Sequence, residues 1–127
     1  QIENFNKIKK TRVETVKYYK KNIIDHSLLE KPILNNGIVP FIYYLRIKNN
    51  LREKFIEFLE KNKIDTGIHW QPGNKFKLFK KIKNSHLVET NKVAREIVTI
   101  PLHSNMKLQD QKKVVHTINN FFKLKNN

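Results

Sequence analysis

The residues with the most chemical variety lie together at positions 64–74, in a chain that is otherwise rich in lysine, asparagine and isoleucine. Gly67 permits backbone conformations that are closed to other residues, and the pair Pro72-Gly73 is typical of a turn. Between them stand three consecutive polar and aromatic groups, namely the imidazole of His69, the indole of Trp70 and the carboxamide of Gln71. The pattern predicts a loop that directs these side chains towards a ligand or towards the rest of the fold.

A second histidine in a comparable position is His103, which follows Pro101-Leu102. Both His69 and His103 come just after an expected short strand, and ligand sites of α/β sheets often lie at strand ends. Taken alone, such an imidazole is better explained by hydrogen bonds to nearby backbone. Trp70 taken alone is better explained as an anchor in the core or at a subunit interface.

No complete set of catalytic residues is recognisable. The five histidines show no helical i, i+4 pair and match no zinc signature. The chain also lacks cysteine, a Walker loop, a GxGxxG pattern and a nucleophile elbow. We therefore predict no catalytic residue and no metal ligand within this chain.

The strong positive charge has two interpretations. The formal charge is +15, from 26 basic and 11 acidic residues, which could indicate a nucleic-acid-binding protein. However, lysine supplies 22 of the 26 basic residues and arginine, the better ligand for phosphate and guanine, only 4. Lysine, asparagine and isoleucine share A/T-rich codons, so genome composition explains the excess of lysine, and we favour this interpretation.

The length of 127 residues predicts one domain, residues 1–127. No apolar run approaches the roughly 20 residues of a membrane span, and no secretory signal is visible. Together with the absence of cysteine, this pattern fits a cytoplasmic protein. Because the first residue is Gln1 and a helical pattern begins at once, we expect the chain to be a piece of a longer protein.

Periodicity predicts the elements of the first half of the chain. Apolar residues at steps of three or four predict a helix over residues 1–22, with Ile2, Phe5, Ile8, Arg12, Val16, Tyr19 and Ile23 on one side. An irregular segment over 25–39, anchored by Leu28, Leu29, Ile33 and Leu34, leads to a central strand over 39–47 that is covered on both faces. A helix capped by Asn50 with Glu53 should then reach Asn62, with Leu51, Phe55, Phe58 and Leu59 buried.

The second half is expected to complete a small α/β or α+β domain. A short strand is predicted over 64–70 and a helical turn over 75–81. A helix over 89–98 should face inward through Val93, Ala94 and Ile97, and an extended piece over 99–102 should pair at a sheet edge. The last helix spans 107–124, with a buried side formed by Leu108, Val114, Val115, Ile118, Phe121 and Phe122.

The order of these motifs is similar to that of a known family. Two segments carry the likeness, TGIHWQP at residues 66–72 and IPLH at residues 100–103, and they follow an aromatic strand and a helix that begins Leu-Arg-Glu. In this order and spacing they resemble the C-terminal domain of the DegT/DnrJ/EryC1/StrS-type sugar aminotransferases. The resemblance extends from about Phe5 to Phe122.

The resemblance implies the small C-terminal domain of the aspartate-aminotransferase-like fold, with a long helix and a sheet of about three strands. Members of the family use pyridoxal phosphate (PLP) to transfer an amino group, usually from glutamate, to a nucleotide-linked keto-sugar for polysaccharide or lipopolysaccharide synthesis. In that family the Schiff-base lysine belongs to a large N-terminal domain. The resemblance therefore implies that this chain alone is inactive and binds no PLP.

The resemblance also implies which residues contact the substrate: His69, Trp70, Gln71, Asn74 and His103. At position 74 the family often has a histidine, and the asparagine here cannot carry an imidazolium charge. The complete enzyme is expected to be a homodimer without membrane or nucleic-acid partners. The alternative is a small basic nucleic-acid-binding domain or a structural interaction module, and the sequence specifies neither the sugar nor the nucleotide.

Overall fold

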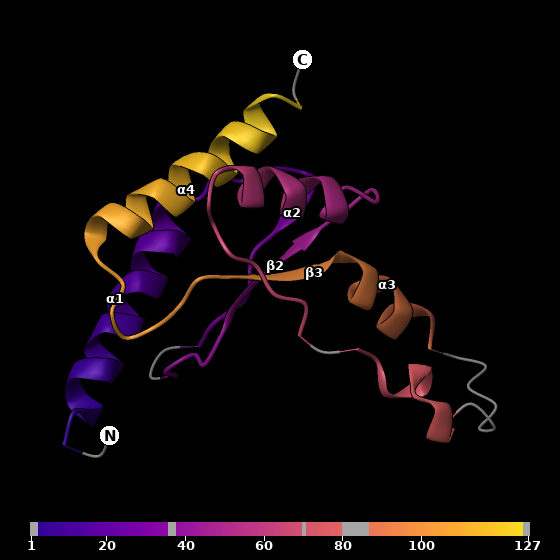
Figure 1. The fold of residues 1–127 in the computed structure, drawn as a ribbon, viewed down its shortest axis with the longest axis horizontal. Helices are drawn as coiled ribbons and strands as arrows, with labels where there is room; N and C mark the ends of the chain where they lie inside the picture. The colour runs from indigo at the N-terminus through magenta and orange to yellow at the C-terminus, as the bar shows by residue number, and fades with distance from the viewer. Residues whose placement is uncertain (1–2, 36–37, 70, 80–86, 126–127) are drawn as a thin grey trace.

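A computed structural model describes residues 3–35, 38–69, 71–79 and 87–125. Four α-helices and a three-stranded antiparallel sheet within these residues confirm the predicted α/β (α+β) class (Figure 1). The elements are α1 (Phe5–Asn22), β1 (Leu29–Glu30), β2 (Tyr43–Ile47), α2 (Arg52–Lys61), the short 3-10 helices η1 (Gly73–Lys75) and η2 (Lys77–Phe79), α3 (Val88–Glu96), β3 (Ile97–Ile100) and α4 (Leu108–Lys123).

The sheet has the order β1-β2-β3. β2 is therefore the central strand, which confirms the prediction made for residues 39–47. Tyr43 of β2 pairs with Ile100 of β3. Tyr43, Leu45 and Ile47 are buried, as the alternation along β2 requires. The expected cover on both faces is complete on one face only, because the other face carries the half-buried Tyr44 and Arg46.

Arg46 explains why that other face of β2 is polar. Its guanidinium lies between two carboxylates, with Nη2 2.7 Å from an oxygen of Glu96 and Nη1 3.1 Å from an oxygen of Glu30. Glu30 belongs to β1 and Glu96 to the end of α3, so one arginine connects three elements. Hydrogen bonds of this charged kind tie α3 to the sheet without burying any side chain of α3.

An aromatic core lies between the buried face of the sheet and helices α2 and α4. The rings of Phe55 and Phe121 pack edge to face at 5.2 Å between centroids, and Phe121 packs on Phe122 at the same separation. The predicted buried side of the last helix is confirmed at Val114, Val115, Ile118, Phe121 and Phe122. It is wrong at Leu108, which is exposed at the first position of α4.

Helix α1 lies beside α4, and only its second half is buried against the rest of the fold (Figure 1). Val16 and Tyr19 are buried there, as predicted, and the ring of Tyr19 meets that of Tyr43 edge to face at 5.3 Å. Phe5, at the start of the same predicted stripe, is 59% exposed. Ile2, the first residue of that stripe, lies outside the described residues.

The predicted start of the central strand is wrong for a reason of hydrogen bonding. The strand begins at Tyr43 rather than at Val39, because the carbonyl oxygens of Pro40 and Phe41 accept hydrogen bonds from Arg12 of α1. Proline also lacks the N–H group that a strand pairing would use. Phe41, expected inside the strand, is 74% exposed.

The predicted capping box at the start of α2 is also wrong. Asn49 and Asn50 both have φ of 56°, in the left-handed region, and the helix begins at Arg52 with no side-chain cap. Glu53, the expected partner of Asn50, accepts hydrogen bonds from Arg52 instead. The buried stripe is confirmed at Phe55 and Leu59, while the other two members, Leu51 and Phe58, are half-buried.

The two irregular segments were predicted less well. The expected loop over 25–39 contains strand β1, with Leu29 buried, but its supposed anchor Ile33 is 94% exposed. The helical turn expected over 75–81 is replaced by η1 and η2, and positions 80 and 81 lie outside the described residues. Pro72-Gly73 does form a turn, in which the carbonyl of Pro72 accepts from the amide of Lys75 at 2.9 Å.

Candidate functional site

The site is built on β3 and on the segment that follows α2. The strand predicted over 64–70 reduces to a single bridge between Gly67 and Thr99 of β3. The Thr99 amide donates to the Gly67 carbonyl at 2.7 Å, and the Gly67 amide donates to the Thr99 carbonyl at 3.1 Å. The expected edge strand over 99–102 is confirmed in part, because β3 ends at Ile100 and pairs with β2 on its other side.

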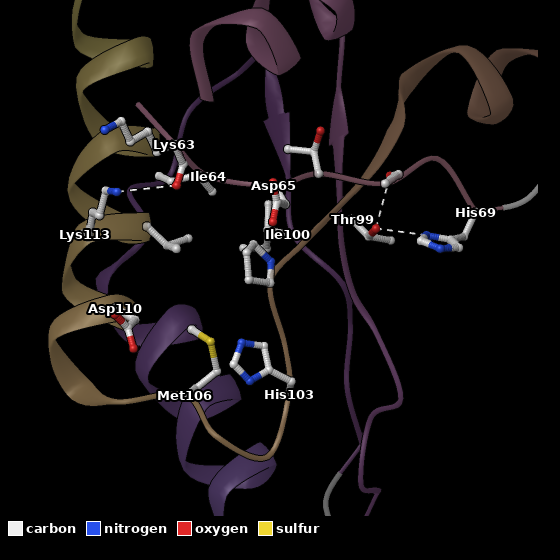
Figure 2. Close-up of a pocket in the computed structure, with 14 residues that line it drawn as sticks. Lys63, Ile64, Asp65, His69, Thr99, Ile100, His103, Met106, Asp110 and Lys113 are labelled. Carbon is white, nitrogen blue, oxygen red and sulfur yellow. Dashed lines mark hydrogen bonds between the residues drawn. The ribbon is translucent and has the colours of Figure 1, made fainter. Parts of the chain in front are cut away.

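A pocket of about 410 Å³ lies where these segments meet the start of α4 (Figure 2). Its lining brings together His69 and His103, which are far apart in the sequence. Figure 2 shows that they reach the pocket from different segments, His69 from the stretch after Gly67 and His103 from the turn before α4. The remaining walls include the apolar side chains of Ile64, Ile100, Pro101, Met106 and Val114.

The charged groups of the pocket balance one another. Two lysines and two aspartates line it, namely Lys63, Lys113, Asp65 and Asp110. Lys113 is oriented along the wall, since its Nζ donates to the carbonyl oxygen of Lys63 at 3.4 Å. With neutral histidines the formal charge of the lining is therefore zero, in a chain whose formal charge is +15.

His69 is held by β3. Its Nδ1 lies 3.0 Å from Oγ1 of Thr99, and the same hydroxyl donates to the carbonyl of Gly67 at 3.1 Å. A Cβ atom on Gly67 would overlap Cε1 of His69 and lie 2.8 Å from Thr99 Oγ1. Glycine is thus required here for a close approach. The left-handed conformation that glycine permits is not used here, because the φ of Gly67 lies outside that region.

His103 is held by its own turn and by α1. The amide of Asn105 donates to Nδ1 of His103 at 3.3 Å. The hydroxyl of Tyr19 donates to the carbonyl of Pro101 at 2.8 Å, which fixes the segment that leads to His103. Burial, with Tyr43 and Asp110 nearby, raises the pKa of Tyr19 far above its ordinary value, so this hydroxyl keeps its proton.

The five predicted site residues are therefore distributed unevenly. Of the four that the structure describes, His69 and His103 line the pocket. Gln71 is exposed and is not part of the lining, and Trp70 lies outside the described residues. Asn74 sits on η1, where its Nδ2 is 3.5 Å from Oδ1 of Asn91 on α3, so it connects these two elements and does not line the pocket.

Sequence reasoning missed Thr99 as part of the site, although it bonds to both the backbone and the imidazole. Thr99 was expected only as part of an extended piece, and no sequence motif links it to His69. The pairing of Gly67 with Thr99 creates the contact, so it required the tertiary structure. Asp110 and Met106 were missed for the same reason, as both come from the turn and first residues of α4.

Two further features are absent from the described residues. No group of three or more histidine, cysteine, aspartate or glutamate side chains among them could hold a metal ion. None of the helices in this part of the chain is long and apolar enough to cross a membrane.

The fold is similar to part of several solved aminotransferase structures. It is similar to part of CalS13, a sugar aminotransferase from Micromonospora echinospora, with a TM-score of 0.85, 19% identity and coverage of 94% of this chain and 32% of that one. It is equally similar to PseC from Helicobacter pylori, an aminotransferase involved in the biosynthesis of pseudoaminic acid, with a TM-score of 0.85, 18% identity and coverage of 98% and 35%.

A third solved structure, the aminotransferase TlmJ from Streptoalloteichus hindustanus, gives a TM-score of 0.87 at 17% identity and coverage of 98% and 34%. No curated protein sequence matches the chain. The model of the DegT/DnrJ/EryC1/StrS aminotransferase family matches residues 1–119. The chain belongs to this family, and it spans about one third of the length of the enzymes that share its fold.

Proposed function

We propose that this chain is the C-terminal, small domain of a PLP-dependent nucleotide-sugar aminotransferase, with residues 1–127 as one domain. In this role it covers the active site and contacts the substrate. The family supports the aminotransferase assignment. The observation that carries the substrate-contacting role is that His69 and His103, distant in sequence, line one pocket at the end of β3.

The proposed substrate contacts are His69, Trp70, Gln71, Asn74 and His103. The two histidines would hydrogen-bond the sugar inside the pocket. The segment after His69 would extend that contact surface, since Gln71 is exposed and Asn74 is tied to α3. None of these residues is assigned a catalytic role, because the proposed function places the chemistry in another part of the enzyme.

We propose that PLP is held elsewhere, because the two lysines of the pocket do not fit this cofactor. The cofactor requires an enclosed lysine amine, a partner for its pyridine nitrogen and donors for its phosphate. The lysines of the pocket, Lys63 and Lys113, are exposed, and Lys113 Nζ is bonded to a backbone carbonyl. The proposal therefore assigns the cofactor, the Schiff-base lysine and the amino-donor chemistry to an N-terminal large domain.

The proposal extends to the complete enzyme. It would transfer an amino group from glutamate to a keto-sugar carried on a nucleotide, in the cytoplasm, as a homodimer. Polysaccharide or lipopolysaccharide synthesis would use the resulting amino sugar. This part of the proposal is supported by family membership and by the sugar aminotransferases that share the fold.

One experiment tests the division of labour between the domains. The chain is incubated with PLP, reduced with borohydride and examined for covalently bound pyridoxyl groups by absorbance and mass spectrometry. We expect no site-specific labelling. Stoichiometric labelling of one lysine would overturn the proposal that this domain holds no cofactor.

A second experiment tests the substrate contacts. The fluorescence of the single tryptophan is followed while UDP-glucose is added at concentrations up to the millimolar range. We expect weak saturable binding that is reduced in His69→Ala and His103→Ala. His116→Ala is the matched control, because His116 is exposed on α4 and is bonded to Asn120. Binding that is equal in all three variants would overturn the assignment of the two histidines.

A further inference from the structure

We infer that the exposed side of α3 and of the neighbouring 3-10 helices is the docking surface for the large domain of the proposed enzyme. This surface, formed by residues 72–78 and 88–95, is called the α3 face. The partner surface that it fits is apolar at its centre and acidic around that centre. The identity of the occupant rests on the proposed function, whereas the exposure of the α3 face does not.

Helix α3 is packed differently from the other described α-helices. It buries no residue, whereas α1, α2 and α4 each bury two or more. A helix of nine residues is marginal in water unless one of its faces packs on something. The carbonyl of Ala94 accepts from Arg52 at 2.6 Å and Glu96 accepts from Arg46 at 2.7 Å. Neither bond reaches the first turn of α3, so this part of the helix would gain most from a partner.

Large apolar side chains are exposed on α3 and on the segment beside it. Val88 is 70% exposed, Phe76 51% and Leu78 82%. Two grooves of about 460 and 470 Å³ lie between α3 and this segment, and both are lined by Pro72 and Ala94. Figure 1 shows η1 and η2 beside α3, away from α1 and α4. Apolar surface gathered in this way is typical of a protein interface.

The charges of the α3 face indicate what kind of surface it binds. Four exposed basic residues lie on it, namely Lys75, Lys77, Lys92 and Arg95. The same stretches of sequence contain one carboxylate, that of Glu89. A second copy docked on this face about a two-fold axis would bring the like charges opposite one another. A partner that carries carboxylates around an apolar centre is complementary instead.

The large domain of the proposed enzyme fits the position of the α3 face. This chain covers 32%, 35% and 34% of three aminotransferases that share its fold, so most of each enzyme lies outside the part that it matches. One of the two grooves is lined by His69, which also lines the candidate pocket. A domain docked on the α3 face therefore lies at the edge of that pocket, where the proposed function requires the domain that holds the cofactor.

Thiol labelling measures whether the α3 face is covered, because the chain has no cysteine of its own. Val88→Cys and Leu78→Cys are made in the 127-residue chain and in the full-length protein encoded by the gene. The rate of maleimide labelling at each position is followed by mass spectrometry of the peptides. We expect rapid labelling in the chain and labelling slower by about tenfold or more in the full-length protein, where reaction requires local opening.

Leu124→Cys is the matched control for these variants. Leu124 is 65% exposed and follows α4, whose C-terminal end lies far from α3 (Figure 1). Its cysteine should react at the same rate in the chain and in the full-length protein. Slowing of all three cysteines by the same factor would overturn the inference, because it would show no preference for the α3 face.

Carbodiimide cross-linking identifies the occupant, because the reagent joins lysine amines to carboxylates that lie in direct contact. In the full-length protein we expect Lys75 and Lys92 to be joined to aspartate or glutamate residues of the large domain. Cross-links from these lysines to a second copy of residues 1–127 would overturn the choice of occupant. Sedimentation of the 127-residue chain as a dimer in which Val88→Cys is protected would also overturn it.

Failure of the inference and failure of the proposed function give different results. Equal labelling of Val88→Cys and Leu78→Cys in the chain and in a full-length protein that binds PLP would overturn the inference alone. A full-length protein without a PLP-bound lysine, as measured by absorbance and borohydride reduction, would overturn the proposed function. In such a protein slow labelling would uphold the docking surface, and the cross-linked peptides would identify its occupant.

Discussion

The aromatic core and the connection after α2 are stabilised in different ways. In the core, Phe55, Phe122 and Leu45 are fully buried, and each is fixed by contacts on all sides. In the connection, residues 65–69 and 71–79, large apolar side chains such as Leu78 are exposed, at 82% in this case. That segment is held instead by a few directional bonds, from Gly67 to Thr99 and from Asn74 to Asn91.

Most of the proposed ligand contacts therefore lie in the less densely packed region, the connection after α2. A side chain fixed by many contacts loses stability when it is truncated, whereas one fixed by a single hydrogen bond mainly loses its orientation. The pocket depends on both regions, because His69 belongs to the connection but is oriented by its hydrogen bond with Thr99 of the sheet. Substitutions in the two regions should therefore affect different measurements.

The largest effect is expected in the core. Phe122→Ala removes a fully buried ring that packs on Phe55 and Phe121, and it should lower the free energy of unfolding by about 3–5 kcal/mol. Leu78→Ala, in the connection, should change it by less than about 0.5 kcal/mol. Urea denaturation followed by circular dichroism measures both. Similar losses for the two variants would contradict the comparison.

The core was the more predictable region for a physical reason. The 3.6-residue periodicity identifies Val114, Ile118 and Phe122 on one face of a helix, and any fold that buries this face must use them. Failures occurred at the ends of these patterns. Leu108 and Phe5 continue their stripes but extend past the elements they would pack against, and a sequence pattern does not reveal where the partner ends.

The next largest effect is a loss of folding stability at alkaline pH, which tests the burial of Tyr43 in the core. Burial raises the pKa of Tyr43 from 10.0 to about 12. Between these values the unfolded chain loses a proton that the folded chain keeps, so the unfolded state binds fewer protons and stability falls as pH rises. A shift of this size corresponds to roughly 2–3 kcal/mol, which is lost between pH values of about 10 and 12.

Tyr43→Phe should reduce this alkaline loss of stability. Denaturation midpoints are measured over the alkaline range for the wild type and the variant, with Tyr44→Phe on the other face of the same strand as the control. Tyr19, whose pKa is also raised mainly by burial, remains in both proteins, so the loss should be reduced but not abolished. An identical alkaline decline in the wild type and Tyr43→Phe would show that Tyr43 is not the source.

A smaller loss of stability, with a larger loss of binding, is expected at Gly67. In Gly67→Ala the new methyl group would overlap the His69 ring and lie 2.8 Å from Thr99 Oγ1, so the ring must move. We expect a loss of stability of about 1–2 kcal/mol, as for moderate overpacking. UDP-glucose binding, measured by tryptophan fluorescence, should weaken by roughly tenfold, the equivalent of one hydrogen bond to an oriented group.

Gly73→Ala is the matched control for this substitution. It lies in the same connection, but a Cβ atom there would meet no other atom within 4 Å. It should leave binding unchanged and leave stability equal or slightly higher, because alanine restricts the unfolded chain. If Gly73→Ala impaired binding as much as Gly67→Ala, general flexibility of the connection would replace the close approach of His69 as the explanation.

The candidate site was only partly predictable from the sequence. His69 and His103 were identified because each follows a strand-like segment, and the structure brings both to one pocket. Thr99, the residue that orients His69, could not be identified, since the contact depends on a single bridge between distant segments. The sequence predicts a strand over 64–70, but among the described residues of that range only Gly67 pairs with β3, and the pattern gives no register for this contact.

The smallest effect tests the turn that was mistaken for a helix cap. Asn49 and Asn50 have φ of 56°, a conformation that costs roughly 1–2 kcal/mol for most residues with a Cβ atom but less for asparagine. Asn50→Ala should therefore lower the free energy of unfolding by about 1 kcal/mol, while Asn50→Gly should preserve or raise it. Had Asn50 served as a side-chain cap, Asn50→Ser would keep the capping bond and most of the stability, whereas serine in the left-handed region should lose about as much as alanine. A serine variant as stable as the wild type would thus restore the cap. A loss in Asn50→Ser and Asn50→Ala that spares Asn50→Gly identifies backbone conformation as the reason for asparagine at the start of α2.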